Sequence, residues 1–150
     1  TAAEYDAEDD QVNRWVELRM TRQKIFEGDD PPRFSAIVDE AVLCREVGGR
    51  ECLVEQLRCL VEHAARPNIE IRVLPFSAGA HASPTGAFRI FTMEERFPEV
   101  GYAETPKGAI YVESPDAERF ARTYDRLRKL TLAPEESAEL ISAMTEELSR

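Results

Sequence analysis

The alternation of apolar and polar positions is clearest over residues 69–74. Ile69, Ile71 and Val73 occupy every second position there, with a charged residue between each pair. A period of two is typical of a β-strand with one buried face. Pro75 lacks the N–H that a strand ladder needs, so the strand should end close to residue 76. We expect this strand to be central to the fold.

Small residues fill the loop Ser77–Gly86, after which residues 87–93 return as a second predicted strand. Loops held by strands at both ends often carry binding or catalytic residues. The histidine of this loop, His81, is therefore a candidate functional residue.

Helices are predicted where apolar residues recur every three or four positions. These segments are residues 9–26, residues 50–65, a helix after Ser114-Pro115, and a last helix that starts at Pro134. At the third, Ser114 is expected to cap the helix and Pro115 to occupy its first turn.

The remaining strands are short. A strand is predicted over residues 34–38, and a helical turn over residues 41–47. The turn sequence Thr105-Pro106-Lys107-Gly108 lies between two further strands, residues 100–104 and 109–113, which predicts a β-hairpin. The resulting order of elements predicts an α+β domain with a single sheet of about five strands covered by helices.

Composition narrows the class of protein. With 150 residues, 43% hydrophobic and 32% charged, the chain is typical of one globular domain. A net charge of −10 repels phosphate backbones, so we expect no binding of nucleic acid by this chain alone. No apolar run approaches the roughly 18 residues of a membrane helix. Three cysteines without framework spacing, Cys44, Cys52 and Cys59, predict reduced thiols and a cytoplasmic location.

Two sets of side chains suggest chemistry. His81 beside Glu40 or Glu104 would suit acid–base catalysis near neutral pH, although His81 fixing its loop by a hydrogen bond to the backbone is the simpler account. Cys59 and His63 are four residues apart on one predicted helix, the spacing of a zinc-binding pair. No Cys-x-x-Cys is present and the two residues border an apolar stripe, so packing is favoured and no metal is expected.

Tyr102 and Tyr111 fall on the two strands of the predicted hairpin. Directly across from each other, they would form an aromatic platform for a ligand or partner, or an ordinary cross-strand contact. The sequence contains neither of the glycine-rich phosphate-binding motifs, and no cofactor is predicted.

Several short motifs follow one another in a characteristic order. They are DEAVL (39–43), VGG (47–49), RPN (66–68), VLPFSAGAH (73–81), GAF (86–88), YAE (102–104), YVE (111–113), DRLR (125–128) and PEES (134–137). With them the chain resembles the C-terminal domain of unknown function that follows an Xre-type helix-turn-helix in actinobacterial (WhiJ-like) transcriptional regulators. The resemblance extends from about Thr1 to Ile141.

The resemblance implies that the helix-turn-helix is absent from this chain, since Thr1 and Glu4-Tyr5 resemble the segment that follows it. It also implies a small partner protein encoded by a neighbouring gene, and it supplies no catalytic residues. The family usually has serine where this chain has Ala133. Loss of that cap should cost the last helix about 1 kcal/mol unless Thr131 replaces it.

Three functional hypotheses follow. The first is a regulatory domain, spanning residues 1–150, that binds a partner protein or small-molecule effector and so modulates DNA binding by the helix-turn-helix. Its expected binding residues are Glu40, His81, Tyr102, Glu104 and Tyr111. The second is an enzyme, or a degenerate toxin-like domain, that uses His81 with Glu104 or Glu40. The third is a dimerisation domain, because regulators of this type read paired half-sites.

Overall fold

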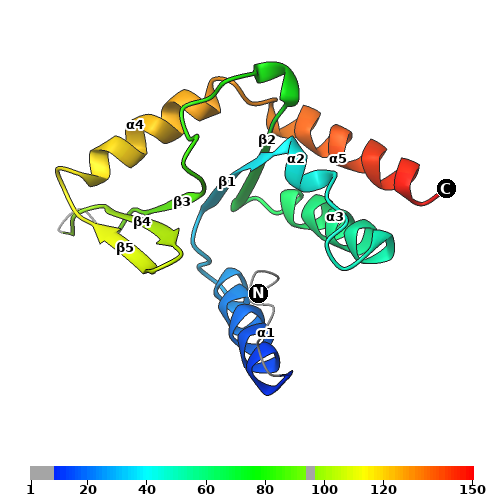
Figure 1. The fold of residues 1–150 in the computed structure, drawn as a ribbon, viewed down its shortest axis with the longest axis horizontal. Coiled ribbons are helices and arrows are strands. Elements are labelled where there is room, and N and C mark those ends of the chain that lie inside the picture. Colours follow the sequence, from blue (N-terminus) through cyan, green and yellow to red (C-terminus); the bar gives the residue numbers. More distant parts are fainter. Residues whose placement is uncertain (1–8, 94–96) are drawn as a thin grey trace. The chain divides into compact units, whose positions relative to one another are not determined.

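The computed structural model describes residues 9–93 and 97–150, with elements labelled as in Figure 1. In chain order they are α1 (Asp9–Gln23), the 3₁₀ turn η1 (Lys24–Phe26), β1 (Phe34–Asp39), α2 (Glu40–Leu43), α3 (Arg50–Ala64), β2 (Ile69–Leu74), the 3₁₀ turn η2 (Phe76–Ala78), β3 (Phe88–Phe91), β4 (Val100–Thr105), β5 (Gly108–Val112), α4 (Ala117–Arg128) and α5 (Pro134–Leu148). The predicted α+β class is confirmed. Thr1 and Glu4-Tyr5, on which the predicted start of the domain rests, lie outside the described residues.

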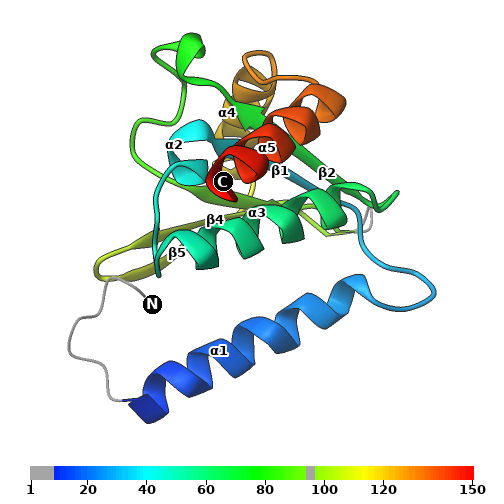
Figure 2. The same ribbon diagram turned by 90° about the vertical axis from the view of Figure 1, so that its right-hand side faces the viewer.

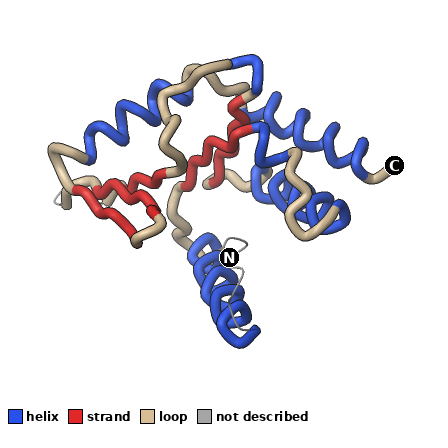
Figure 3. The backbone as a smooth tube through the Cα atoms, viewed as in Figure 1, coloured by secondary structure: helices blue, strands red, loops and turns tan. Residues whose placement is uncertain are grey.

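The strands, red in Figure 3, number five within the described part of the chain, as expected. They form two sheets instead of one: β1 pairs with β2, and β3, β4 and β5 form an antiparallel sheet in that order. The segment that follows β2 explains why the strands form two separate sheets. Pro75 ends the strand and turn η2 follows, with Gly79 at a φ of 66°, so the chain does not fold back onto β2 as a hairpin.

The chain divides into two compact units whose segments alternate along the sequence. Unit 1 takes its described residues from Thr1–Ala36, Leu43–Ile71 and Ala138–Arg150. Unit 2 comprises Ile37–Val42 and Arg72–Ser137. The division passes through β1, α2, β2 and α5, and each unit is described in turn.

Unit 1 contains α3 and the greater part of α5, which lie side by side in Figures 1 and 2. Leu53 and Leu57, on the predicted apolar side of α3, are buried. Arg50 joins the two helices: its Nε donates to the carbonyl of Leu148 at 2.6 Å, and its Nη2 to that of Glu147 at 3.3 Å. A cation at the C-terminal end of a helix satisfies free carbonyls and opposes the negative end of the helix dipole.

Helix α1 also belongs to unit 1, but none of its side chains is buried. Val16, on its predicted apolar side, is 50% exposed. The helix forms as predicted, and its apolar side is only partly covered within the described chain. None of the described helices has the length and apolarity required to span a bilayer.

In unit 2, α4 packs on one face of the three-stranded sheet (Figure 1). The rings of Phe88 on β3 and Phe120 on α4 meet edge to face at 5.3 Å. The predicted start of α4 is wrong: the helix begins at Ala117, and Ser114 provides no cap. Backbone carbonyls, including that of Glu113 for the N–H of Ala117 at 3.1 Å, satisfy the first amides instead.

Helix α5 starts at Pro134, as predicted. The carboxylate of Glu136 accepts the backbone N–H of Ala133 at 2.9 Å, which is one half of a capping box. The hydroxyl of Thr131 donates to the carbonyl of Arg128 at 2.8 Å and therefore does not replace the missing serine cap.

Candidate functional site: an aromatic face on the three-stranded sheet

The register of the sheet separates its residues into two faces. Phe88 pairs with Ala103, and Gly101 with Val112, on the face that α4 covers. Successive residues of a strand point to opposite sides, so the intervening positions lie on the other face. Five of these, which we call the aromatic face, are Arg89, Phe91, Tyr102, Glu104 and Tyr111.

The rings of the aromatic face contact one another across the strands. Tyr102 and Tyr111 are directly paired, with ring centroids 5.0 Å apart and planes at 60°. Phe91 meets Tyr102 from the other side, with centroids 6.5 Å apart. Both are edge-to-face arrangements, which the quadrupoles of aromatic rings favour. The predicted pairing of the two tyrosines is confirmed.

Polar groups complete the aromatic face. The guanidinium carbon of Arg89 lies 5.4 Å from the centroid of Tyr102, within cation–π range. The hydroxyl of Tyr102 donates to Oε1 of Glu104 at 2.8 Å. This hydrogen bond, followed by partial desolvation and the negative charge of Glu104, raises the pKa of Tyr102 above its ordinary value. The phenol therefore stays protonated and remains a donor.

The aromatic face is open to solvent at its edges. Tyr111 is 68% exposed and Phe91 is 47% exposed, whereas Tyr102 between them is half-buried. Tyrosine and arginine are among the residue types that contribute most to protein–protein binding energy. Large exposed aromatic side chains that already hold one another in place lose little conformational freedom on binding.

The other two expected binding residues lie apart from this face. Oε2 of Glu40 accepts the backbone N–H of Phe76 at 2.6 Å, which links the start of α2 to turn η2. Nδ1 of His81 accepts the backbone N–H of Ser83 at 3.3 Å, so His81 bonds to its own loop. Within residues 9–93 and 97–150, no hydrogen bond joins His81 to Glu40 or Glu104.

Sequence reasoning did not select Arg89 or Phe91. Both lie in a segment predicted to be a strand, and their alternation with Phe88 and Ile90 was visible. Their position on the same face as Tyr102 depends on the pairing of β3 with β4, which no local pattern specifies.

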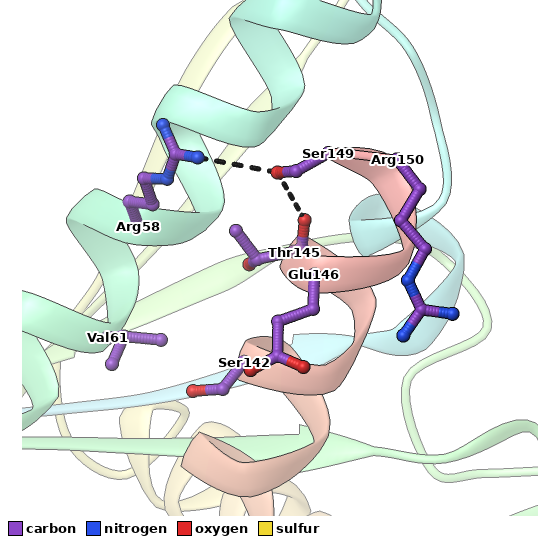
Figure 4. A pocket seen from close by; sticks show the side chains of 7 residues that line it. All are labelled: Arg58, Val61, Ser142, Thr145, Glu146, Ser149 and Arg150. Carbon is purple, nitrogen blue, oxygen red and sulfur yellow. Dashed lines mark hydrogen bonds between the residues drawn. The ribbon is translucent and has the colours of Figure 1, made fainter.

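A second polar region lies between α3 and α5, at a cavity of about 520 Å³ (Figure 4). The hydroxyls of Ser142, Thr145 and Ser149 each donate to the carbonyl four residues earlier on the helix. Nη2 of Arg58 then donates to the oxygen of Ser149 at 3.3 Å. The three hydroxyls and Arg58 thus bond within the protein, and none of the expected binding residues is among the described residues that line this cavity.

Cys59 and His63 lie close together on α3. Their Sγ and Nδ1 atoms are 3.4 Å apart, and Nδ1 also lies 2.8 Å from the carbonyl of Cys59, the geometry of a donor to that carbonyl. That arrangement fixes the orientation of the imidazole ring on α3. The described residues contain no group of three or more metal-ligating side chains.

The comparisons with known proteins give one match. No significant match was found among the curated proteins or among the solved structures. A family model described as a domain of unknown function, DUF5753, matches residues 1–143. The chain therefore belongs to the DUF5753 family.

Proposed function

We propose that this chain is the regulatory domain of a helix-turn-helix transcriptional regulator and that it binds a small partner protein through the aromatic face. Binding of the partner would change the affinity of the attached helix-turn-helix for its operator, a coupling typically worth about 1–3 kcal/mol. The observation that carries the proposal is the mutual contact of Tyr111, Tyr102 and Phe91 on an open sheet face.

The charge of the chain favours the same class of partner. A net charge of −10 attracts a basic protein and keeps this domain away from DNA. The gene next to that of the regulator is the expected source of the partner, as the resemblance to WhiJ-like regulators implies. A small-molecule effector is the alternative ligand of the same domain.

The enzymatic hypothesis receives less support from the geometry. A general base must lie within about 2.6–3.2 Å of the group it serves, or reach it through one water. His81 bonds to the N–H of Ser83, and the carboxylates of Glu40 and Glu104 bond to Phe76 and Tyr102 respectively. These contacts are structural, which favours a binding domain.

The proposal is tested by calorimetry of the full regulator with the product of the neighbouring gene. Tyr111→Ala should weaken binding by about 2 kcal/mol, close to thirtyfold, because an exposed anchor is removed. Phe76→Ala is the matched control, since Phe76 is an aromatic residue of similar exposure, 61%, away from the aromatic face. Equal affinity of Tyr111→Ala and the unaltered protein would contradict the proposal.

A double substitution separates the binding and enzymatic hypotheses. His81→Ala with Glu40→Ala should leave the partner affinity in place, because neither residue belongs to the aromatic face. Loss of a catalytic activity in that variant, with binding retained, would favour the enzyme. Operator binding measured with and without the partner then reports whether the domain regulates the helix-turn-helix.

A further inference from the structure

The outer edge of β5 has no strand beside it within the described part of the chain. The order of the sheet is β3, β4, β5, so β5 pairs with β4 alone. Helix α4 packs on β3 and β4, and Ile110 of β5 is 50% exposed. Natural proteins protect such edges with charged residues, prolines or bulges. The segment Gly108–Val112 has no charge and no proline, and its register with β4 is regular.

The register of the hairpin shows which backbone groups of β5 point outward. Thr105 and Gly108 form the pair that closes a two-residue turn, and such a pair exchanges backbone hydrogen bonds. Hydrogen-bonded and non-hydrogen-bonded pairs alternate along an antiparallel ladder, so Ile110 also bonds toward β4. Ala109 and Tyr111 therefore direct their backbone groups away from β4. Each of these two residues offers one N–H and one C=O to a further strand.

We propose that β5 pairs with β5 of a second copy of this chain, antiparallel and centred on Ile110. In this register Ala109 of each copy lies opposite Tyr111 of the other, and their outward N–H and C=O groups bond to each other. The two copies of Ile110 meet as a non-hydrogen-bonded pair, in which side chains approach closely. The result is a closed dimer with one continuous sheet, an interaction distinct from the proposed binding of a partner.

Charges at the two ends of β5 favour the same register. Lys107 precedes the strand and Glu113 follows it, and both side chains are exposed. An antiparallel pair centred on Ile110 sets Lys107 of each copy opposite Glu113 of the other. Centring the pair on Ala109 or Tyr111 would leave both charges without an opposite charge across the interface. Exposed ion pairs add little affinity, but they select one register over another.

The net charge of −10 opposes the approach of two copies. At physiological salt the Debye length is about 8 Å, so charges distant from the edge are largely screened. The paired segments are short and the interface is accordingly small. We therefore expect a weak dimer, with a dissociation constant of about 1–100 μM.

Sedimentation equilibrium of the chain at a series of protein concentrations tests the proposal. The unaltered protein should pass from the mass of one chain to that of two as the concentration rises. Ile110→Lys should stay a monomer, because two like charges would meet at the centre of the pair. A monomer at every concentration of the unaltered protein would overturn the proposal.

An exchange of charges tests the register. Lys107→Glu and Glu113→Lys should each weaken the dimer about tenfold, because like charges then face each other at both ends of the pair. The double variant should recover the affinity of the unaltered protein. The two residues lie about 20 Å apart along one extended strand, so this recovery must come from contact between two copies. A double variant weaker than both single variants would overturn the register.

The matched control is Arg119→Glu, which makes the same change in net charge as Lys107→Glu but on α4. It should retain the affinity of the unaltered dimer, and equal weakening would overturn the proposal, since total charge would then explain the effect. Circular dichroism confirms that each variant is folded.

A strand of the partner protein is the other possible occupant of this edge. Calorimetry of Ile110→Lys with the product of the neighbouring gene separates the two cases, because Ile110 pairs with Ala103 and so lies on the opposite side of the sheet from the aromatic face. Retained partner binding with loss of the dimer would support the second copy. Loss of partner binding, with an unaltered protein that is always monomeric, would assign the edge to the partner instead.

Discussion

At Ser137 a single hydroxyl connects a strand with the start of a helix. The residue is fully buried, and its Oγ accepts the backbone N–H of Val73 at 2.9 Å while donating to the carbonyl of Ala133 at 2.8 Å. The hydroxyl uses both of its bonding roles at once. It thereby satisfies an amide on β2, a strand whose side chains supply much of the core.

Ser137→Ala should lower the free energy of unfolding by about 1–3 kcal/mol, because the buried N–H of Val73 loses its acceptor. Urea denaturation measures the loss. Ser142→Ala is the control: its hydroxyl also donates to the carbonyl four residues earlier but accepts no strand amide that we observe. The control should change the free energy by less than about 0.5 kcal/mol.

Tyr102 should titrate above its ordinary pKa of 10.0, because its neutral hydroxyl donates to Glu104 and because the carboxylate repels a phenolate. The pKa is raised in the folded protein, so the neutral phenol stabilises the fold at every pH below 10.0. That contribution is lost as the pH rises through the folded-state pKa. The near-ultraviolet absorbance of tyrosinate follows the titration.

Glu104→Gln keeps an acceptor but removes the charge, so the midpoint of Tyr102 should fall toward 10.0. Glu113→Gln removes an equal charge from an exposed position outside the aromatic face and should leave the midpoint in place. An unchanged midpoint in Glu104→Gln would show that the negative charge of Glu104 does not control this pKa.

Among the elements, β4 approaches α4 so closely that only glycine fits at position 101. A Cβ there would lie 2.8 Å from Cδ2 of Phe120 and 2.8 Å from Cγ2 of Val112. These separations are shorter than any ordinary carbon contact, so the helix sits against the bare backbone of the strand.

Gly101→Ala should destabilise the protein by about 1–3 kcal/mol through overpacking. Thermal unfolding monitored by circular dichroism gives the change. Adding Phe120→Leu should recover part of the loss, because the smaller side chain gives room to the new methyl group. A double variant no more stable than the single one would place the clash elsewhere.

Helix α5 retains only half of its capping box, since Glu136 is present and the serine is replaced by Ala133. Ala133→Ser should add about 1 kcal/mol to the free energy of unfolding by giving a free amide of the first turn an acceptor. The same substitution combined with Glu136→Ala should gain less, because the reciprocal bond is then missing. Chemical denaturation distinguishes the two.

Much of the secondary structure follows from local patterns. Alternation with a terminal Pro75 predicted β2, and the turn Thr105–Gly108 predicted the hairpin, whose register in turn places Tyr102 opposite Tyr111. The division into two sheets and the start of α4 at Ala117 were not predictable in this way. The first depends on which strands pair across long stretches of sequence, and the second on which backbone carbonyls, such as that of Glu113, accept the first amides of the helix.

The residues of the candidate site differ in the same way, since some could be predicted from local sequence and others could not. The tyrosine pair belongs to one hairpin and was accessible from the sequence. Arg89 and Phe91 join it through the pairing of β3 with β4, across a connection whose length and composition do not specify a register. Glu40 was expected at the site but bonds to Phe76, thirty-six residues later in the chain, a contact that no periodicity reveals.

On the scale of the whole molecule, the net charge of −10 should govern how a partner approaches. If the proposed partner is basic, raising the ionic strength from about 0.01 M to about 0.15 M shortens the Debye length from about 30 Å to about 8 Å. The association rate should then fall more than the dissociation rate rises. Surface plasmon resonance separates the two rates, and a salt-independent association rate would contradict electrostatic attraction.

The alternation of unit 1 and unit 2 along the chain has a genetic consequence. Residues Ile37–Val42 belong to unit 2, yet they are flanked on both sides by segments of unit 1. A single crossover between two related genes would therefore exchange fragments of both units, and no one breakpoint transplants either unit whole. Variation in this domain is expected to spread by point substitution more readily than by shuffling, and chimeras intended to swap one unit need several junctions.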